Sequence, residues 1–177
     1  MCGIIGVISK KTNPDFQSEF IEPLGQALNR MEYRGPDNKG IWSENGICLG
    51  HRRLSIIDLS DDGNQPFQSS NQQYVIVFNG EIYNYLELRT ELKKLGHHFI
   101  SESDTEVVIH AYQEWGTECV KRFNGMWSFC IYDQHKQLCF ASRDRLGVKP
   151  FYYLNTKHFL AFASEQKAFV KAGLLKP

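Results

Sequence analysis

Four short apolar segments between residues 126 and 165 constrain the fold of this 177-residue chain more than any other feature. They are MWSFCIYD at 126–133, QLCFASRD at 137–144, PFYYL at 150–154 and HFLAFASE at 158–165. Each is rich in aromatic and other residues that favour strands, and short connections separate them. Parallel strands need a crossover of a dozen or more residues, so this spacing predicts an antiparallel meander.

The first half alternates predicted strands with one helix. Strands are predicted at 2–9 (CGIIGVIS), 40–43, 47–57 and 74–80, the last ending in a glycine turn at Gly80. Apolar residues from Phe20 to Met31 recur at helical spacing, and RGPD closes that helix. The polar segment 58–73 is predicted to be a loop, and connections of that length are usually functional or disordered. We expect this loop to be functional.

Two further helices follow the strand at 74–80. YLELRTELKKLG at 85–96 is amphipathic and has Gly96 at its stop. In the helix at 103–116, Ser103 is the predicted N-cap, and Glu106 lies three residues on, at the capping-box spacing. The last segment, 166–177, is predicted to be a short helix that leaves the core.

Charge and hydropathy exclude several classes of partner. Lys plus Arg and Asp plus Glu both total 20, so the net charge is zero and gives no reason to expect binding to nucleic acid or to an anionic membrane. No run approaches 18 apolar residues, and the N-terminus lacks the pattern of a signal peptide. We therefore expect a cytoplasmic protein.

The cysteines and histidines indicate no metal site. Five cysteines occur without a CxxC pair, and six histidines without HExxH. An odd number of cysteines also argues against a disulfide framework, so we expect reduced thiols. Cys130 and Cys139 are predicted to approach each other across a hairpin.

Cys2 follows directly on the initiating methionine. If Met1 is removed, Cys2 carries both a thiol and an α-amine with an ordinary pKa of about 7.7 to 8.0. A nucleophile and a base then lie on one residue. The alternative is a small buried hydrophobe, since free cysteine is often simply buried. The opening MCGIIGV leaves both interpretations open.

Three polar clusters lie at the ends of predicted elements, where loops commonly carry chemistry. They are HRRLSIID at 51–58, FNGEIYN at 78–84 and SDTE at 103–106. Taken singly, each has an ordinary explanation: a surface ion pair, a turn or a helix cap.

Together with Cys2, these clusters resemble the class II glutamine amidotransferase domain, of the N-terminal-nucleophile hydrolase type. Five further motifs in the same order extend the similarity: MCGI at the start, RGPD at 34–37, QP at 65–66, FNGMWSFCIYD at 123–133 and RDRLGVKPFYY at 143–153. RLSIID and the last motif look most like the asparagine synthetase branch. The resemblance implies an α+β fold, a four-layer α/β/β/α sandwich of two antiparallel sheets. It also implies a domain over 2–165, with 166–177 starting a linker.

The resemblance implies that Cys2 attacks the side-chain amide of L-glutamine, giving a thioester, ammonia and then glutamate. Its α-amine takes the thiol proton and later returns one to ammonia. The side-chain amide of Asn79 and the backbone N–H of Gly80 are the implied donors to the oxyanion. Asparagine supplies an NH₂ donor, and glycine lets the backbone approach closely.

The implied substrate-binding residues are Arg53, Leu54, Ser55, Ile56, Ile57, Glu81 and Asp104. Arg53 holds the α-carboxylate in a two-pronged contact. Asp104 takes the α-ammonium with Glu81 nearby, and residues 54–57 line the pocket. Arg34 and Asp37 are implied to hold the N-terminal segment, with an ordinary loop ion pair as the alternative.

Ammonia released by such a domain needs an acceptor. Members of this family carry a second, synthetase domain, and in asparagine synthetases an SGGxDS loop there binds ATP. This chain has neither that loop nor GxxxxGK[ST]. We expect no cofactor in this domain, and ATP and Mg²⁺ only in a covalently linked synthetase domain absent from this chain. Two alternatives remain: an N-terminal-cysteine acylase acting on another amide, or a non-catalytic domain for glutamine sensing or assembly.

Overall fold

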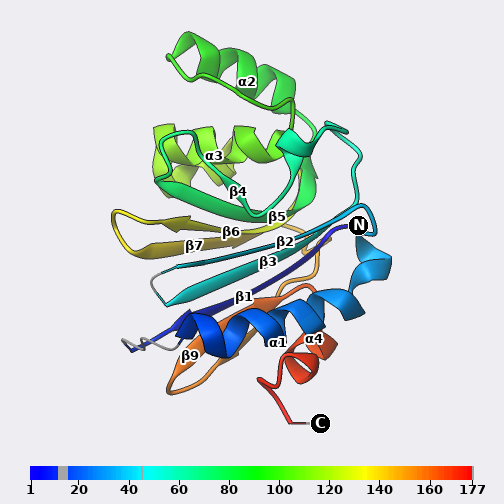
Figure 1. Cartoon of the computed structure of the whole chain (residues 1–177). Coiled ribbons are helices and arrows are strands. Elements are labelled where there is room, and N and C mark those ends of the chain that lie inside the picture. The colour runs from blue at the N-terminus through cyan, green and yellow to red at the C-terminus, as the bar shows by residue number, and fades with distance from the viewer. Residues whose placement is uncertain (12–15, 45, 177) are drawn as a thin grey trace. The chain divides into compact units, whose positions relative to one another are not determined.

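The computed structural model describes residues 1–11, 16–44 and 46–176, and the chain divides into two compact units (Figure 1). The first unit comprises Met1–Leu54 and Pro150–Pro177, and the second comprises Ser55–Lys149. Each unit is described by itself. Among the described residues, no helix is long and apolar enough to cross a membrane.

The first unit is built on a five-stranded antiparallel sheet with the order β2-β3-β1-β9-β8. Its strands are β1 (Gly3–Ser9), β2 (Asn38–Glu44), β3 (Ile47–Arg53), β8 (Tyr152–Asn155) and β9 (Phe159–Ala163). Its helices are α1 (Phe16–Arg30) and α4 (Gln166–Lys171), with a short 3₁₀ turn at Glu32–Arg34. β1 is the central strand, which places the start of the chain in the middle of the sheet.

Helix α1 covers one face of this sheet because its apolar side chains recur on one side. Phe16, Phe20, Leu24 and Leu28 are buried in one cluster with the β1 residues. Helix α4 adds Ala168 and Phe169 to the same cluster, and Ala172, directly after the helix, is buried there as well. The predicted last helix is therefore present, but it packs on the core instead of leaving it, because these residues are buried there. Pro177 lies outside the described residues.

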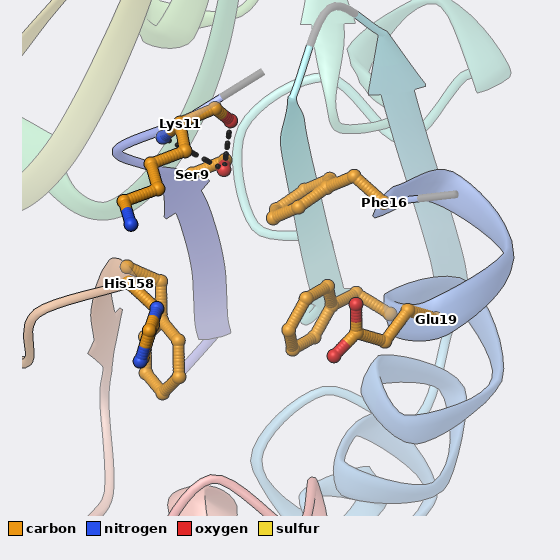
Figure 2. Close-up of a pocket in the computed structure, with 7 residues that line it drawn as sticks. Ser9, Lys11, Phe16, Glu19 and His158 are labelled. Atoms are coloured by element: carbon orange, nitrogen blue, oxygen red, sulfur yellow. Dashed lines mark hydrogen bonds between the residues drawn. The ribbon is translucent and has the colours of Figure 1, made fainter. Parts of the chain in front are cut away.

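A hollow of about 370 Å³ opens in the first unit between the start of α1 and the end of β1 (Figure 2). Its lining residues are Ser9, Lys11, Phe16, Glu19, Phe20, His158 and Phe159. None of them belongs to the residues predicted to act on a substrate.

The second unit is built on a four-stranded antiparallel sheet with the order β4-β5-β6-β7. Its strands are β4 (Phe67–Gln68), β5 (Tyr74–Ile82), β6 (Gly125–Asp133) and β7 (Leu138–Arg143). Its helices are α2 (Tyr85–Lys94) and α3 (Asp104–Trp115), with 3₁₀ turns at Asp61–Gly63 and Gly116–Lys121. The predicted loop at 58–73 thus contains a short strand and a 3₁₀ turn.

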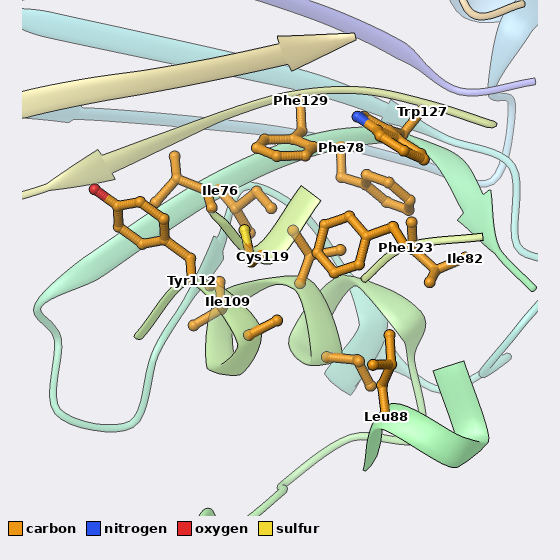
Figure 3. Packing of buried hydrophobic residues seen from close by; sticks show 14 of the residues in the cluster. Ile76, Phe78, Ile82, Leu88, Ile109, Tyr112, Cys119, Phe123, Trp127 and Phe129 are labelled. Carbon is orange, nitrogen blue, oxygen red and sulfur yellow. The ribbon is translucent and has the colours of Figure 1, made fainter. Parts of the chain in front are cut away.

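An aromatic core joins this sheet to its helices (Figure 3). Phe78 and Ile82 of β5 and Trp127 and Phe129 of β6 point toward the helices, where they meet Ile109 of α3 and its neighbours. Two antiparallel sheets, each with helices packed on one face, confirm the predicted α+β class and the sheets and helices of the four-layer sandwich.

Helix ends follow the sequence signals. The Ser103 hydroxyl accepts a hydrogen bond from the N–H of Glu106, at 3.3 Å, which confirms the predicted N-cap of α3. The Glu106 carboxylate reaches back further than a capping box requires, to the N–H groups of Ile100 and Ser101 at 2.9 and 2.8 Å. Gly96, with φ of +96°, lies just beyond α2 as predicted.

Two strand predictions are wrong in their ends. The predicted strand at 47–57 stops at Arg53, because β1 and β2 begin at Gly3 and Asn38 and leave no partner strand beyond that point. The predicted turn at Gly80 is absent, and β5 continues to Ile82. Gly80 lies opposite Trp127, and a Cβ there would come within 2.4 Å of the Met126 carbonyl oxygen. The glycine serves close strand packing, not a turn.

The four strands predicted to form one antiparallel meander do not belong to a single sheet. β6 and β7 belong to the second unit, whereas β8 and β9 pair in the first. The connection after β7 is closed locally by the buried Asp144, whose carboxylate accepts hydrogen bonds from the N–H groups of Trp127, Val148 and Lys149. These bonds end the pairing of β7 and turn the chain away from its sheet.

Candidate functional site

Cys2 lies at the start of β1, and its sulfur contacts the backbone of Leu54. The Leu54 N–H donates to Sγ at 3.4 Å, and the thiol lies 3.7 Å from the Leu54 carbonyl oxygen. The thiol thus donates to one backbone group of Leu54 and accepts from the other, and these two contacts hold the sulfur beside the end of β3. Burial raises the pKa of Cys48 to about 11 and of Cys119 to about 12, so those thiols stay protonated. Cys2 is half-buried and therefore accessible to a small molecule.

The RGPD motif holds the backbone at both ends of this contact. The Arg34 Nε donates to the Cys2 carbonyl oxygen at 3.0 Å, and its Nη1 pairs with Glu165 at 3.0 Å. The Tyr33 hydroxyl bonds the same Glu165 carboxylate. At the other end of the motif, the Asp37 N–H donates to the Arg53 carbonyl at 3.0 Å. Arg34 thus contacts the N-terminal segment directly, whereas the Asp37 contact is a backbone bond to the end of β3.

Arg53 is the last residue of β3, and its guanidinium side chain is only 5% exposed. The pairing of Gly3 with Arg52 brings the start of β1 beside the end of β3. The first unit thus brings Cys2, Arg34, Asp37, Arg53 and Leu54 together. Ser55, Ile56 and Ile57 belong to the second unit, where Ile56 is 60% exposed.

Asn79 lies on β5 of the second unit and is 1% exposed. Within the part of the chain that the structure describes, its side-chain nitrogen Nδ2 has no hydrogen-bond partner. A buried donor without a partner costs roughly 1–3 kcal/mol, so native structures rarely retain one without a reason. Its position leaves this nitrogen available to an acceptor supplied by a ligand.

Gly80 follows Asn79, and its N–H points to the edge of β5 that faces away from β6. In an antiparallel strand alternate residues turn their N–H groups to the same side. The N–H groups of Phe78 and Ile82 both bond side chains on that outer edge, Gln65 Oε1 at 2.6 Å and Asp104 Oδ2 at 3.0 Å. The Gly80 N–H lies between them, and β4 pairs only with Val75 and Ile76.

Asp104 opens helix α3 and is 6% exposed. Burial raises its pKa to about 6, against the lowering effect of the Ile82 N–H bond, and the nearby charge of Glu81 raises it further. Two carboxylates held close together favour a bound cation, because an ammonium between them relieves both the burial and the mutual repulsion. The second unit thus brings Asn79, Gly80, Glu81 and Asp104 together.

The motifs gave no role to Gln65, although QP was part of the resemblance. Its side chain accepts a hydrogen bond from the Phe78 N–H and donates one to the Thr105 hydroxyl. Both partners are distant in the sequence, so the dipeptide does not reveal them.

No group of three or more His, Cys, Asp or Glu side chains that could hold a metal ion occurs within residues 1–11, 16–44 and 46–176.

Known proteins resemble this chain along nearly its whole length. A family model described as a glutamine amidotransferase domain matches residues 1–177. An asparagine synthetase (glutamine-hydrolysing) of Bacillus subtilis is 40% identical over 176 residues, which are 96% of this chain and 27% of the relative. A putative asparagine synthetase (glutamine-hydrolysing) of Methanocaldococcus jannaschii is 42% identical over 189 residues, which are 96% of this chain and 35% of the relative.

A solved structure shows the same fold. Glutamine phosphoribosylpyrophosphate amidotransferase from Bacillus subtilis superposes with a TM-score of 0.77 at 20% identity, covering 97% of this chain and 44% of that one. The chain therefore spans about a third or less of the length of the two asparagine synthetase relatives and under half of the solved structure.

Proposed function

The chain belongs to the family of glutamine amidotransferase domains, as its eight motifs predict, and from this premise we propose that it hydrolyses L-glutamine through a thioester on Cys2. The α-amine of Cys2, once Met1 is removed, takes the thiol proton. The sulfur attacks the side-chain carbonyl carbon, the C–N bond breaks, and the amine returns the proton to the departing ammonia. Water then cleaves the thioester to glutamate.

The observation that best supports this proposal is the buried side-chain nitrogen of Asn79 without a partner. The tetrahedral intermediate carries a negative oxygen that needs preorganised donors. We assign Asn79 Nδ2 and the Gly80 N–H to that oxygen. Both are fixed on a central stretch of β5, so little reorganisation is needed when the charge develops.

Recognition of free glutamine is assigned to Arg53 and to the Asp104 and Glu81 pair. A guanidinium matches a carboxylate with two parallel hydrogen bonds, and the two acids suit an ammonium. Residues 54–57 are assigned to the lining of the substrate pocket. An acylase for other amides needs no such contacts with the substrate's α-carboxylate and α-ammonium.

We expect the chain to release glutamate from L-glutamine and to lose most of its kcat/KM with two altered substrates. N-acetyl-L-glutamine lacks the ammonium, and L-glutamine methyl ester lacks the carboxylate. Each removes the group that one of the proposed contacts recognises, and such mismatches discriminate by several orders of magnitude. Glutamate or ammonia release measures all three substrates.

Equal kcat/KM on the three substrates would favour the acylase alternative. Binding of L-glutamine without any turnover, by a chain shown by mass to begin at Cys2, would favour the sensing or assembly alternative.

Replacement of Arg53 by lysine is expected to raise KM for glutamine more than it lowers kcat. Lysine keeps the charge but loses the planar, two-pronged contact. If this contact forms equally in the ground and transition states, its loss appears in KM. Steady-state kinetics distinguish the two parameters. An unchanged KM with equal losses in kcat and kcat/KM would instead assign Arg53 to transition-state stabilisation.

In the whole protein we propose that the ammonia passes to a covalently linked synthetase domain that uses ATP and Mg²⁺ to form asparagine. The support is that two relatives are named as glutamine-hydrolysing asparagine synthetases, and this chain spans 27% and 35% of their lengths. We propose that the glutaminase reaction itself needs no cofactor and that the protein works in the cytoplasm.

A further inference from the structure

The outer edge of β5 carries three N–H groups that β4 does not reach, those of Phe78, Gly80 and Ile82. An unpaired strand edge normally bonds water or another strand. Here the first and third N–H groups are each bonded by a buried side chain, Gln65 and Asp104, which leaves the one between them for a ligand.

Gln65 makes two hydrogen bonds at once. Its Oε1 accepts from the Phe78 N–H at 2.6 Å, and its Nε2 donates to the Thr105 hydroxyl oxygen at 3.1 Å. Gln65 is 6% exposed and Thr105 3%, so water does not readily replace either bond. One planar carboxamide thereby ties β5, one residue before Asn79, to the first turn of α3, one residue after Asp104.

Asp104 ties the same two elements from the other side of Gly80 through its bond to the Ile82 N–H. The two side chains therefore fix the spacing between the β5 edge and the start of α3 at both ends of the Asn79–Gly80 stretch. Ser103 and Glu106 fix the start of α3 in turn, through the N-cap and the bonds to Ile100 and Ser101.

We propose that Gln65 is a positioning residue for the glutaminase reaction: it sets the orientation of the Gly80 N–H and of Asn79 while holding Asp104 beside them. This inference rests on the proposed function. Gln65 touches no reacting atom, and its effect passes through the β5 backbone and Thr105.

The test compares Gln65→Met, Thr105→Val and the double variant with the parent chain after removal of Met1. Methionine keeps the length of Gln65 without its amide, and valine keeps the shape of Thr105 without its hydroxyl. A misplacement of about 1 Å can cost a hundredfold in rate, so we expect Gln65→Met to lower kcat by about ten- to a hundredfold. KM should change less than about threefold. Thr105→Val, the milder change, should lower kcat less.

The matched control is Gln68→Met. Gln68 lies on β4 in the same segment, and its side-chain amide donates a long hydrogen bond to the Gln72 carbonyl at 3.4 Å. Its kcat should stay at the parent value. Because Gln65 and Thr105 act through one bond, the double variant should lose little more kcat than Gln65→Met alone.

A kcat of Gln65→Met within threefold of the parent, or additive losses in the double variant, would overturn the inference. So would an equal loss in Gln68→Met. All rates are measured well below the unfolding temperature of each variant, and Thr105→Val keeps the test decisive if Gln65→Met fails to fold. Failure of the parent chain to hydrolyse glutamine, or full activity of a Cys2→Ala variant, would instead refute the proposed function.

Discussion

A chain with a non-removable residue in front of Cys2 is expected to fold normally and to release no more glutamate than a Cys2→Ala control. While any residue precedes Cys2, its nitrogen lies in a peptide bond, which is planar and not basic. The thiol then loses its proton acceptor, and cysteine without an adjacent base is in general a weak nucleophile at neutral pH.

The surroundings of the sulfur add to this expectation. The Leu54 N–H and carbonyl that contact Sγ supply a donor and an acceptor, but neither serves as a catalytic base. Arg34 fixes the Cys2 carbonyl at 3.0 Å, so the segment is held in place whether or not Met1 is present. Met1 itself is 55% exposed, and an extension there leaves the β1 pairing undisturbed.

The measurement uses one precursor whose extension a protease can remove to expose Cys2 and one whose extension resists it. Glutamate release is recorded before and after cutting, with intact mass to confirm the new terminus. Loss of the catalytic base in a comparable acyl-transfer enzyme costs about a millionfold, so the uncut forms should lie at background. Equal activity before and after cutting would show that the base is another group.

Local signals in the sequence predicted the helices well. The Ser103 cap and the Gly96 stop depend on atoms within a few residues of each other, so the pattern carries the whole interaction. Strand ends and sheet membership depend on which distant segments pair. No single segment of the sequence therefore indicates that β3 ends at Arg53. Nor does one indicate that β6 and β7 lie in a different sheet from β8 and β9.

The candidate site likewise combines features that the sequence indicates with contacts that only the tertiary structure determines. The resemblance of the motifs to the amidotransferase family supplied the residues assigned to the reaction, such as Cys2, Arg53 and Asn79, and those assignments stay predictions. The motifs did not reveal that Leu54 donates its N–H to the Cys2 sulfur, or that Gln65 bonds Phe78 and Thr105. Both are contacts of ordinary backbone or amide groups, and only the tertiary structure selects their partners.

Asn79→Ala is expected to lower kcat by about a hundred- to a thousandfold while KM for glutamine stays close to the parent value. Removal of one oxyanion donor typically costs about 2.7 to 4 kcal/mol in the transition state. The charge that this donor meets is absent from the ground state, so glutamine binding does not depend on it. Steady-state kinetics of glutamate release separate the two effects.

Thermal unfolding distinguishes this role from a structural one. Asn79 Nδ2 has no partner among the described residues, so its removal breaks no hydrogen bond of that nitrogen and the unfolding temperature should stay near that of the parent. Asn84→Ala is the matched control. Asn84 donates to the Arg122 carbonyl at 3.0 Å and accepts from the Asn124 N–H at 2.9 Å, so this variant should unfold at a lower temperature and keep its kcat. A kcat of Asn79→Ala within threefold of the parent would remove Asn79 from the oxyanion site, and the buried unpaired nitrogen would then need another ligand.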